Sequence, residues 1–176
     1  MKFWVACAAI GAMAAAPAYA QTRTVSASDP AGMVTLLEEV GYEPELSKDS
    51  FGDPEIELVM GDWNASIMFY GCDEDTHDKC DSIQLIGGFD TQGSVTAEQA
   101  LAISKSHRYS QVTIDDEGDV WVRWDMLIGD DFPAPVFLRH LRAFASSLDN
   151  AGEMVFPDEA KAEAEAMEEA VEEAAE

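Results

Sequence analysis

The feature that most constrains the fold is a hairpin signal in the second half of the chain. Two runs of alternating apolar residues, 110–115 and 120–128, flank the sequence Asp-Glu-Gly-Asp at 116–119. An acidic residue followed by Gly between two such runs is a strong local signal for an antiparallel hairpin. Since consecutive strand residues point to opposite faces, Trp121 and Arg123 are expected on one face of the second strand, with Val122 and Trp124 on the other.

Further strands and helices are predicted on both sides of this hairpin. Extended runs cover 43–49, 55–60, 65–70 and 82–89, with a turn at 61–64 between the second and third. Helical periodicity covers 29–41, 96–107 and 136–148. Asp29 before Pro30, and Thr96 three residues before Gln99, are typical helix starts. This order of elements predicts an α+β fold, with an antiparallel sheet and helices packed against one face.

The ends of the chain differ in composition from this central segment. Lys2, an apolar run over 3–16 and Ala18-Tyr19-Ala20 before Gln21 match a secretory signal peptide over residues 1–20. The apolar run is shorter than the roughly 20 residues that span a bilayer. We therefore expect cleavage after Ala20, loss of Cys7 with the signal, no membrane insertion afterwards, and a periplasmic or secreted protein. A flexible segment (21–28), one domain (29–156) and an acidic Ala/Glu-rich tail (157–176) are predicted to follow.

The chain is strongly acidic, with 35 Asp and Glu against 10 Lys and Arg, a formal charge of −25. Nucleic-acid binding depends on neutralising phosphates with Lys and Arg, so this balance argues against it, and equally against anionic lipid surfaces. It favours solubility and is compatible with a cationic partner. The tail is expected to be a solvated helix or disordered, with a partner-binding helix as the alternative.

Two cysteines, Cys72 and Cys80, remain after cleavage of the signal. An even pair in an oxidising compartment is most simply a disulfide, worth about 2.5 kcal/mol for a loop of this size. A metal site using Cys72, His77, Asp78 and Cys80 is the alternative, although zinc sites favour closer Cys spacing. Free thiols are a third reading. No cofactor is expected.

No catalytic motif for hydrolysis, phosphate binding or metalloprotease chemistry occurs in the chain, and the three histidines are scattered. We therefore expect no enzyme and no catalytic residue. The aromatic content instead suggests a contact surface, since exposed aromatics beside Arg are typical of protein interfaces. Candidate partner-binding residues are Trp121, Arg123, Tyr109 and Trp63, and the alternative is that these aromatics belong to the core.

Several stretches resemble the YbjN family of bacterial proteins. They include Tyr70-Gly71-Cys72, the run from Cys80 to Leu85, a strand ending at Phe89, Arg108-Tyr109, the hairpin over 114–118, the strand beginning Trp124-Asp125, and the last amphipathic helix. The similarity covers roughly residues 29–156. It implies an α+β fold similar to that of type III secretion chaperones, which bind protein segments and do not turn over substrates. The family's label is that of a sensory transduction regulator.

Together these observations predict an exported, non-enzymatic, protein-binding domain, chaperone-like or regulatory, that acts in the cell envelope on an unidentified protein partner. A homodimer is expected because chaperones of similar fold often pair. The alternative is a small ligand- or metal-binding periplasmic protein that uses the Cys72–Cys80 loop. A hydrolase without a recognisable motif is the third reading.

Overall fold

A computed structural model describes residues 23–157 of the chain. The predicted signal peptide and all but the first residue of the predicted acidic tail lie outside these residues. The described part is an α+β fold, as predicted, with a six-stranded sheet and three helices. Among the described residues, no helix combines the length and the apolar character needed to cross a bilayer.

The sheet has the strand order β2-β3-β4-β5-β7-β6, and every neighbouring pair is antiparallel. The hairpin predicted from the Gly118 turn is formed by β6 and β7, with β7 inserted between β5 and β6. The strands are β2 (Glu45–Lys48), β3 (Pro54–Met60), β4 (Trp63–Tyr70), β5 (Ser82–Phe89), β6 (Gln111–Ile114) and β7 (Val120–Leu127).

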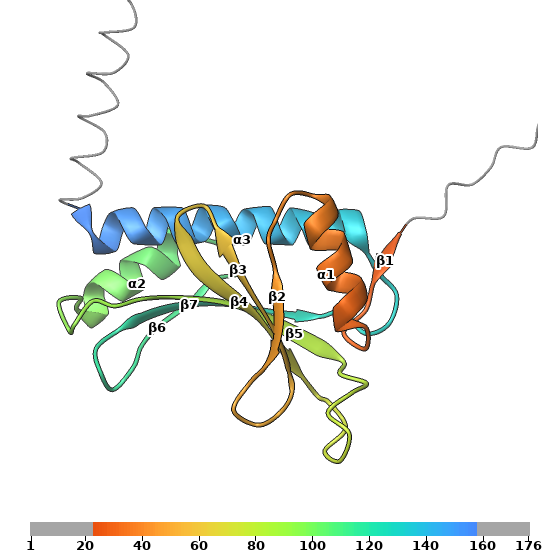
Figure 1. Cartoon of the computed structure of the whole chain (residues 1–176). Helices are drawn as coiled ribbons and strands as arrows, with labels where there is room; N and C mark the ends of the chain where they lie inside the picture. Colours follow the sequence, from red (N-terminus) through yellow and green to blue (C-terminus); the bar gives the residue numbers. More distant parts are fainter. Residues whose placement is uncertain (1–22, 158–176) are drawn as a thin grey trace, which may run out of the picture.

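Three helices pack on one face of this sheet, with α3 lying along it (Figure 1). They are α1 (Pro30–Glu39), α2 (Ala97–Ser106) and α3 (Ala134–Val155). Both predicted helix starts are confirmed: the Asp29 carboxylate accepts a hydrogen bond from the backbone N–H of Gly32, and Thr96 and Gln99 form a capping box. A two-stranded ribbon, β1 (Thr24–Val25) with β8 (Phe132–Pro133), joins the start of the described chain to the start of α3.

The core lies between α3 and the inward-facing residues of the central strands. Ile83, Leu85 and Phe89 of β5 alternate with less buried residues, as a one-sided sheet requires. The matching face of α3 contributes Phe137, Leu141, Phe144 and Leu148, each fully buried. The helix comes so close to β5 that a Cβ at Gly87 would lie 2.6 Å from Cδ2 of Leu148. Glycine at that position is therefore a packing requirement.

Three local features differ from the sequence-based expectations. The turn predicted over 61–64 is shorter, because Trp63 pairs with Met60 and begins β4. Helix α3, predicted to end at 148, continues to Val155, since Ala151 and Val155 also face the core. Within the segment predicted to be flexible, residues 24–25 form β1, and Val25 and Ala27 are buried.

The position of Leu148 gives a direct test of this packing. Leu148→Ala should lower the free energy of unfolding by about 2–5 kcal/mol, because it removes a fully buried side chain and leaves a cavity between α3 and β5. The matched control is Leu127→Ala, whose side chain is 88% exposed and which should change stability by less than about 0.5 kcal/mol. Urea unfolding followed by circular dichroism measures the stability of both variants. Equal losses of unfolding free energy in the two would contradict the core described above.

Candidate functional site

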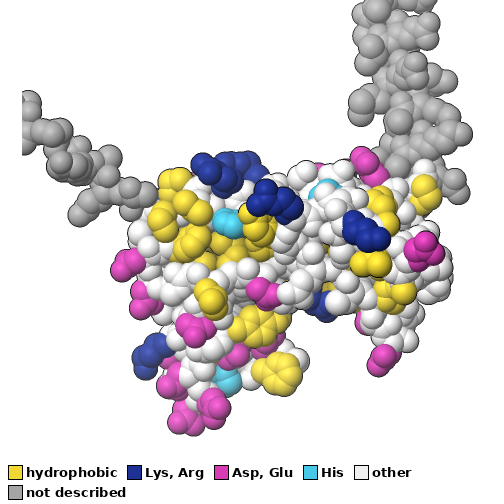
Figure 2. Space-filling view, turned by 180° about the vertical axis from the view of Figure 1, so that it is seen from behind, with side chains coloured by type: hydrophobic (Ala, Val, Ile, Leu, Met, Phe, Trp, Pro, Cys, Tyr) yellow, Lys and Arg dark blue, Asp and Glu magenta, His cyan; other side chains and the backbone are white. Residues whose placement is uncertain are grey.

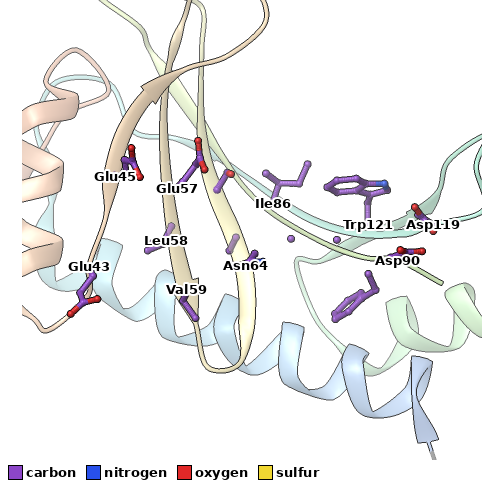
Figure 3. A pocket seen from close by; sticks show the side chains of 15 residues that line it. Glu43, Glu45, Glu57, Leu58, Val59, Asn64, Ile86, Asp90, Asp119 and Trp121 are labelled. Carbon is purple, nitrogen blue, oxygen red and sulfur yellow. The ribbon is translucent and has the colours of Figure 1, made fainter. Parts of the chain in front are cut away.

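The opposite face of the sheet is left uncovered by any helix in the described part of the chain. Side chains that alternate with the core residues point to this side, among them Trp121, Arg123 and Leu127 of β7. We call this surface the open face. It holds a depression of about 650 Å³ that extends from β2 across to β7 (Figure 3). Its volume lies within the usual range for ligand sites, which makes it the candidate site.

The depression is bordered by carboxylates at both ends. Figure 3 shows Glu43, Glu45 and Glu57 on one side and Asp90 and Asp119 on the other, with Ile86 and Trp121 between them. No Lys or Arg is among the described residues that line it. The local field is therefore negative, which favours cationic groups and disfavours phosphates and carboxylates as ligands.

Two of these carboxylates oppose each other directly. Glu45 of β2 and Glu57 of β3 are register partners, and side chains of partner residues project from the same face. Ser47 donates a hydrogen bond of 3.1 Å from its Oγ to Oε1 of Glu57. Glu45 has no hydrogen-bond or ion-pair partner among the described residues. Like charges placed opposite each other destabilise a sheet, so the pair is an unfavourable arrangement in the free protein.

Trp121 is held in a fixed orientation at the other end of the depression. Its Nε1–H donates a hydrogen bond of 2.8 Å to Oδ2 of Asp115. Its ring lies over Gly88, its cross-strand neighbour on β5, where a Cβ would come within 2.7 Å of Cζ3. The guanidinium carbon of Arg123 lies 5.6 Å from the ring centroid. The indole is therefore a prepositioned aromatic surface on the open face.

The Asp115 carboxylate stabilises both the β6–β7 turn and the orientation of Trp121. Its Oδ1 accepts hydrogen bonds from the backbone N–H groups of Glu117 and Asp119, which close the β6–β7 turn. The hydrogen bond from Trp121, together with these backbone donors, lowers the pKa of the Asp115 carboxyl below its usual value. Asp115 therefore both closes the turn and holds Trp121, a connection that the sequence analysis did not predict.

The four candidate partner-binding residues do not form one surface. Trp121 and Arg123 lie together on the open face, whereas Tyr109 and Trp63 lie on the helix side. Tyr109 is 64% exposed and contacts Trp124, with ring centroids 5.2 Å apart. Trp63 packs edge-on against Phe89 at 4.8 Å, and its ring lies against Gly152 of α3.

The Cys72–Cys80 loop is closed by a disulfide between these two residues. His77 Nδ1 lies 2.8 Å from Oδ1 of Asp53 in the neighbouring turn between β2 and β3. Asp73 accepts hydrogen bonds from the hydroxyl and backbone N–H of Thr76, which lower the pKa of its carboxyl. The alternative metal site would need both thiolates, which the disulfide occupies. Within residues 23–157, no group of three or more His, Cys, Asp and Glu side chains is placed to hold a metal ion.

The remaining histidines lie apart from the open face. His140 of α3 is surrounded by aromatic rings, the nearest being Trp124 with centroids 5.6 Å apart. His107 follows α2 as its C-cap. Neither of these two histidines lines the depression on the open face.

Sequence reasoning missed Glu45, Glu57, Gly88 and Asp115 as parts of the site. The first two become neighbours only through the β2–β3 register, which the weak strand pattern over 43–49 does not define. Asp115 and Trp121 could have been linked from the hairpin itself, since both lie next to its turn.

A family model matches most of the chain. The family model YbjN, described as "Putative bacterial sensory transduction regulator", matches residues 29–157. A search of curated proteins finds no match.

The disulfide should contribute measurably to stability. Cys72→Ser should lower the free energy of unfolding by about 2.5 kcal/mol, because the unfolded chain regains the freedom of the closed loop. A reductant should destabilise the unaltered protein similarly but leave the Cys72→Ser/Cys80→Ser double variant unaffected. Thermal unfolding with and without reductant tests this prediction. An unfolding midpoint of the unaltered protein that does not change with reductant would refute a stabilising disulfide.

The Asp115 bond should make stability depend on pH in the acid range. Because the pKa of the folded state lies below the ordinary value of 3.8, the stabilisation is present above that value and is lost as the pH falls through the folded-state pKa. At neutral pH, Asp115→Ala should lower the urea midpoint, while Asp116→Ala, a neighbouring exposed acid, should not. The difference in urea midpoint between the original protein and Asp115→Ala should narrow as the pH falls below 3.8 and through the folded-state pKa. A difference in midpoint that stays constant with pH would show that the charge of the Asp115 carboxylate does not contribute to its hydrogen bonds.

Proposed function

Because the chain belongs to the YbjN family, we propose that it is an exported, non-enzymatic regulator that acts by binding another protein in the cell envelope. The family description supplies the regulatory role. Export and protein binding are inferences from the sequence and from the open face of the sheet.

The observation that carries the proposal is the composition of the open face. An aromatic ring fixed by Asp115 and Gly88 lies beside Arg123, with the apolar side chains Leu127 and Val59 exposed on the same surface. Trp and Arg are enriched among the residues that contribute most to protein–protein binding energy. A prepositioned indole also loses little conformational entropy when a partner binds. These properties support a protein contact better than a catalytic centre.

Two features support an envelope location. The apolar leader ending at Ala20 matches a secretory signal. The Cys72–Cys80 disulfide suits an oxidising compartment, because cytosolic thiols are kept reduced. The resemblance to type III secretion chaperones supports a chaperone-like mode of action, in which a segment of the partner lies along the domain, and also a homodimer as the working form.

The test compares two sets of variants in the mature chain, residues 21–176. Immobilised protein should retain a partner from envelope extracts, and Trp121→Ala/Arg123→Ala should abolish its recovery because it removes the open-face anchor. Arg108→Ala/Tyr109→Ala removes the same types of side chain from the helix side and should leave recovery unchanged. Quantitative mass spectrometry of the eluates measures both. Equal recovery by the two variants, or no specific partner from the unaltered protein, would reject the proposed function.

A further inference from the structure

We propose that the depression on the open face binds a basic, extended peptide segment of the partner, with a Lys or Arg side chain seated between the Glu45/Glu57 pair and the indole of Trp121. This inference rests on the proposed function and identifies the chemistry of the partner. It is argued from the shape of the depression, from its charge and from the two structural features at its ends.

The shape suits a peptide side chain with part of its backbone. A depression of about 650 Å³ falls within the usual range for ligand sites and exceeds what one side chain fills. Its lining combines apolar atoms of Ile86 and Val59 with the backbone of two glycines, Gly87 and Gly88. Such a surface can receive an aliphatic stem as well as a charged end, as a Lys or Arg side chain offers.

The charge distribution selects a cation. The two ends of the depression carry five carboxylates, and the basic residues of the described chain lie mostly elsewhere. Figure 2, seen from behind, shows several of the Lys and Arg side chains at the level of α3, and none of the residues that line the depression is a Lys or Arg. Arg139 and Arg142 are exposed on α3, and Lys105 and Arg108 on or beside α2. The five carboxylates around the depression therefore attract an approaching basic segment to the open face.

The two ends of the depression suit the two parts of a Lys or Arg side chain, its charged end and its aliphatic stem. Cross-strand partners bring their Cβ atoms within about 4.5–5.5 Å, so Glu45 and Glu57 repel each other until a positive charge lies between them. The Trp121 ring, which lies over Gly88 with the Arg123 guanidinium 5.6 Å from its centroid, offers apolar surface to the aliphatic stem of the bound side chain. Because both features are fixed before binding, little free energy is lost in arranging them.

A peptide fits better than a bare metal ion or a small polyamine. The carboxylates lie around a wide depression, and the described residues contain no group of three or more metal-binding side chains in ligating positions. A peptide adds apolar contacts with Ile86 and Val59 from neighbouring side chains, which a bare ion cannot offer. The chosen occupant is therefore a Lys- or Arg-bearing segment of a protein.

The experiment uses fluorescently labelled Gly/Ser-rich peptides that carry several lysines, or glutamate or norleucine at the same positions. Fluorescence anisotropy should show binding of the lysine peptide alone, with affinity falling as salt rises. Glu45→Gln/Glu57→Gln should weaken binding by about tenfold or more. Glu38→Gln/Glu153→Gln makes the same change in net charge on exposed helix positions and should leave binding nearly unchanged.

A second readout does not depend on the peptide. Glu45→Gln/Glu57→Gln should raise the unfolding midpoint of the free protein at low salt, because it removes the repulsion between two register partners. An unchanged or lowered midpoint would refute the claim that this pair is held in an unfavourable state. A rise would also show that the variant is folded when its binding is measured.

The remaining outcomes separate this inference from the proposed function. The proposal of a basic segment would be overturned if the norleucine or glutamate peptide bound as tightly as the lysine peptide. It would also be overturned if both Glu→Gln double variants lost the same affinity for the lysine peptide. Spermidine that binds as tightly as the lysine peptide would overturn the choice of a peptide. If Trp121→Ala/Arg123→Ala abolishes partner recovery while Glu45→Gln/Glu57→Gln retains it, the open face binds protein without a cation, and only the further inference fails.

Discussion

The close approach of α3 to β5 is the contact on which the rest of the structure depends. Leu148 reaches the strand at Gly87, and Trp63 reaches the helix at Gly152, so the helix lies flat on one face. Because α3 covers this face, the apolar residues of four strands point toward it. The more polar residues that alternate with them along each strand point to the opposite face. The character of the open face therefore follows from the close packing of α3 on the opposite face of the sheet.

Two adjacent glycines in β5 connect the core to the site. Since neighbouring strand residues point to opposite faces, Gly87 admits Leu148 on the helix side, and Gly88 admits the Trp121 ring on the open side. A bulkier residue at Gly88 would lift the indole from the sheet and move Nε1 relative to Asp115. The orientation of Trp121 is thus fixed by backbone on one side and by a turn carboxylate on the other, with no contribution from the helices.

The sequence predicted the features that depend on local rules. The β6–β7 hairpin, the caps at Asp29 and Thr96 and the α+β class follow from turn chemistry, capping and periodicity, and the structure confirms them. The features it did not predict depend on contacts distant in sequence. Gly61 and Asn64 on either side of Trp63 predict a turn, but Trp63 packs against Phe89 and pairs with Met60 as the first residue of β4. The Glu45–Glu57 pair likewise follows from strand register, for which the short strand β2 carries no clear pattern.

The carboxylates of the open face restrict how copies of this chain can associate. A symmetric dimer through the open faces would bring the carboxylates around each depression against those of the other copy, and such like-charge contacts cost free energy. Contact between the open face of one copy and α3 of the next, with its exposed Arg139 and Arg142, is electrostatically favourable. That arrangement is head-to-tail, however, and it closes only as a ring or continues as a filament. A two-fold dimer of this fold must therefore use surfaces on the helix side or at the sheet edges, which leaves both open faces accessible to a partner.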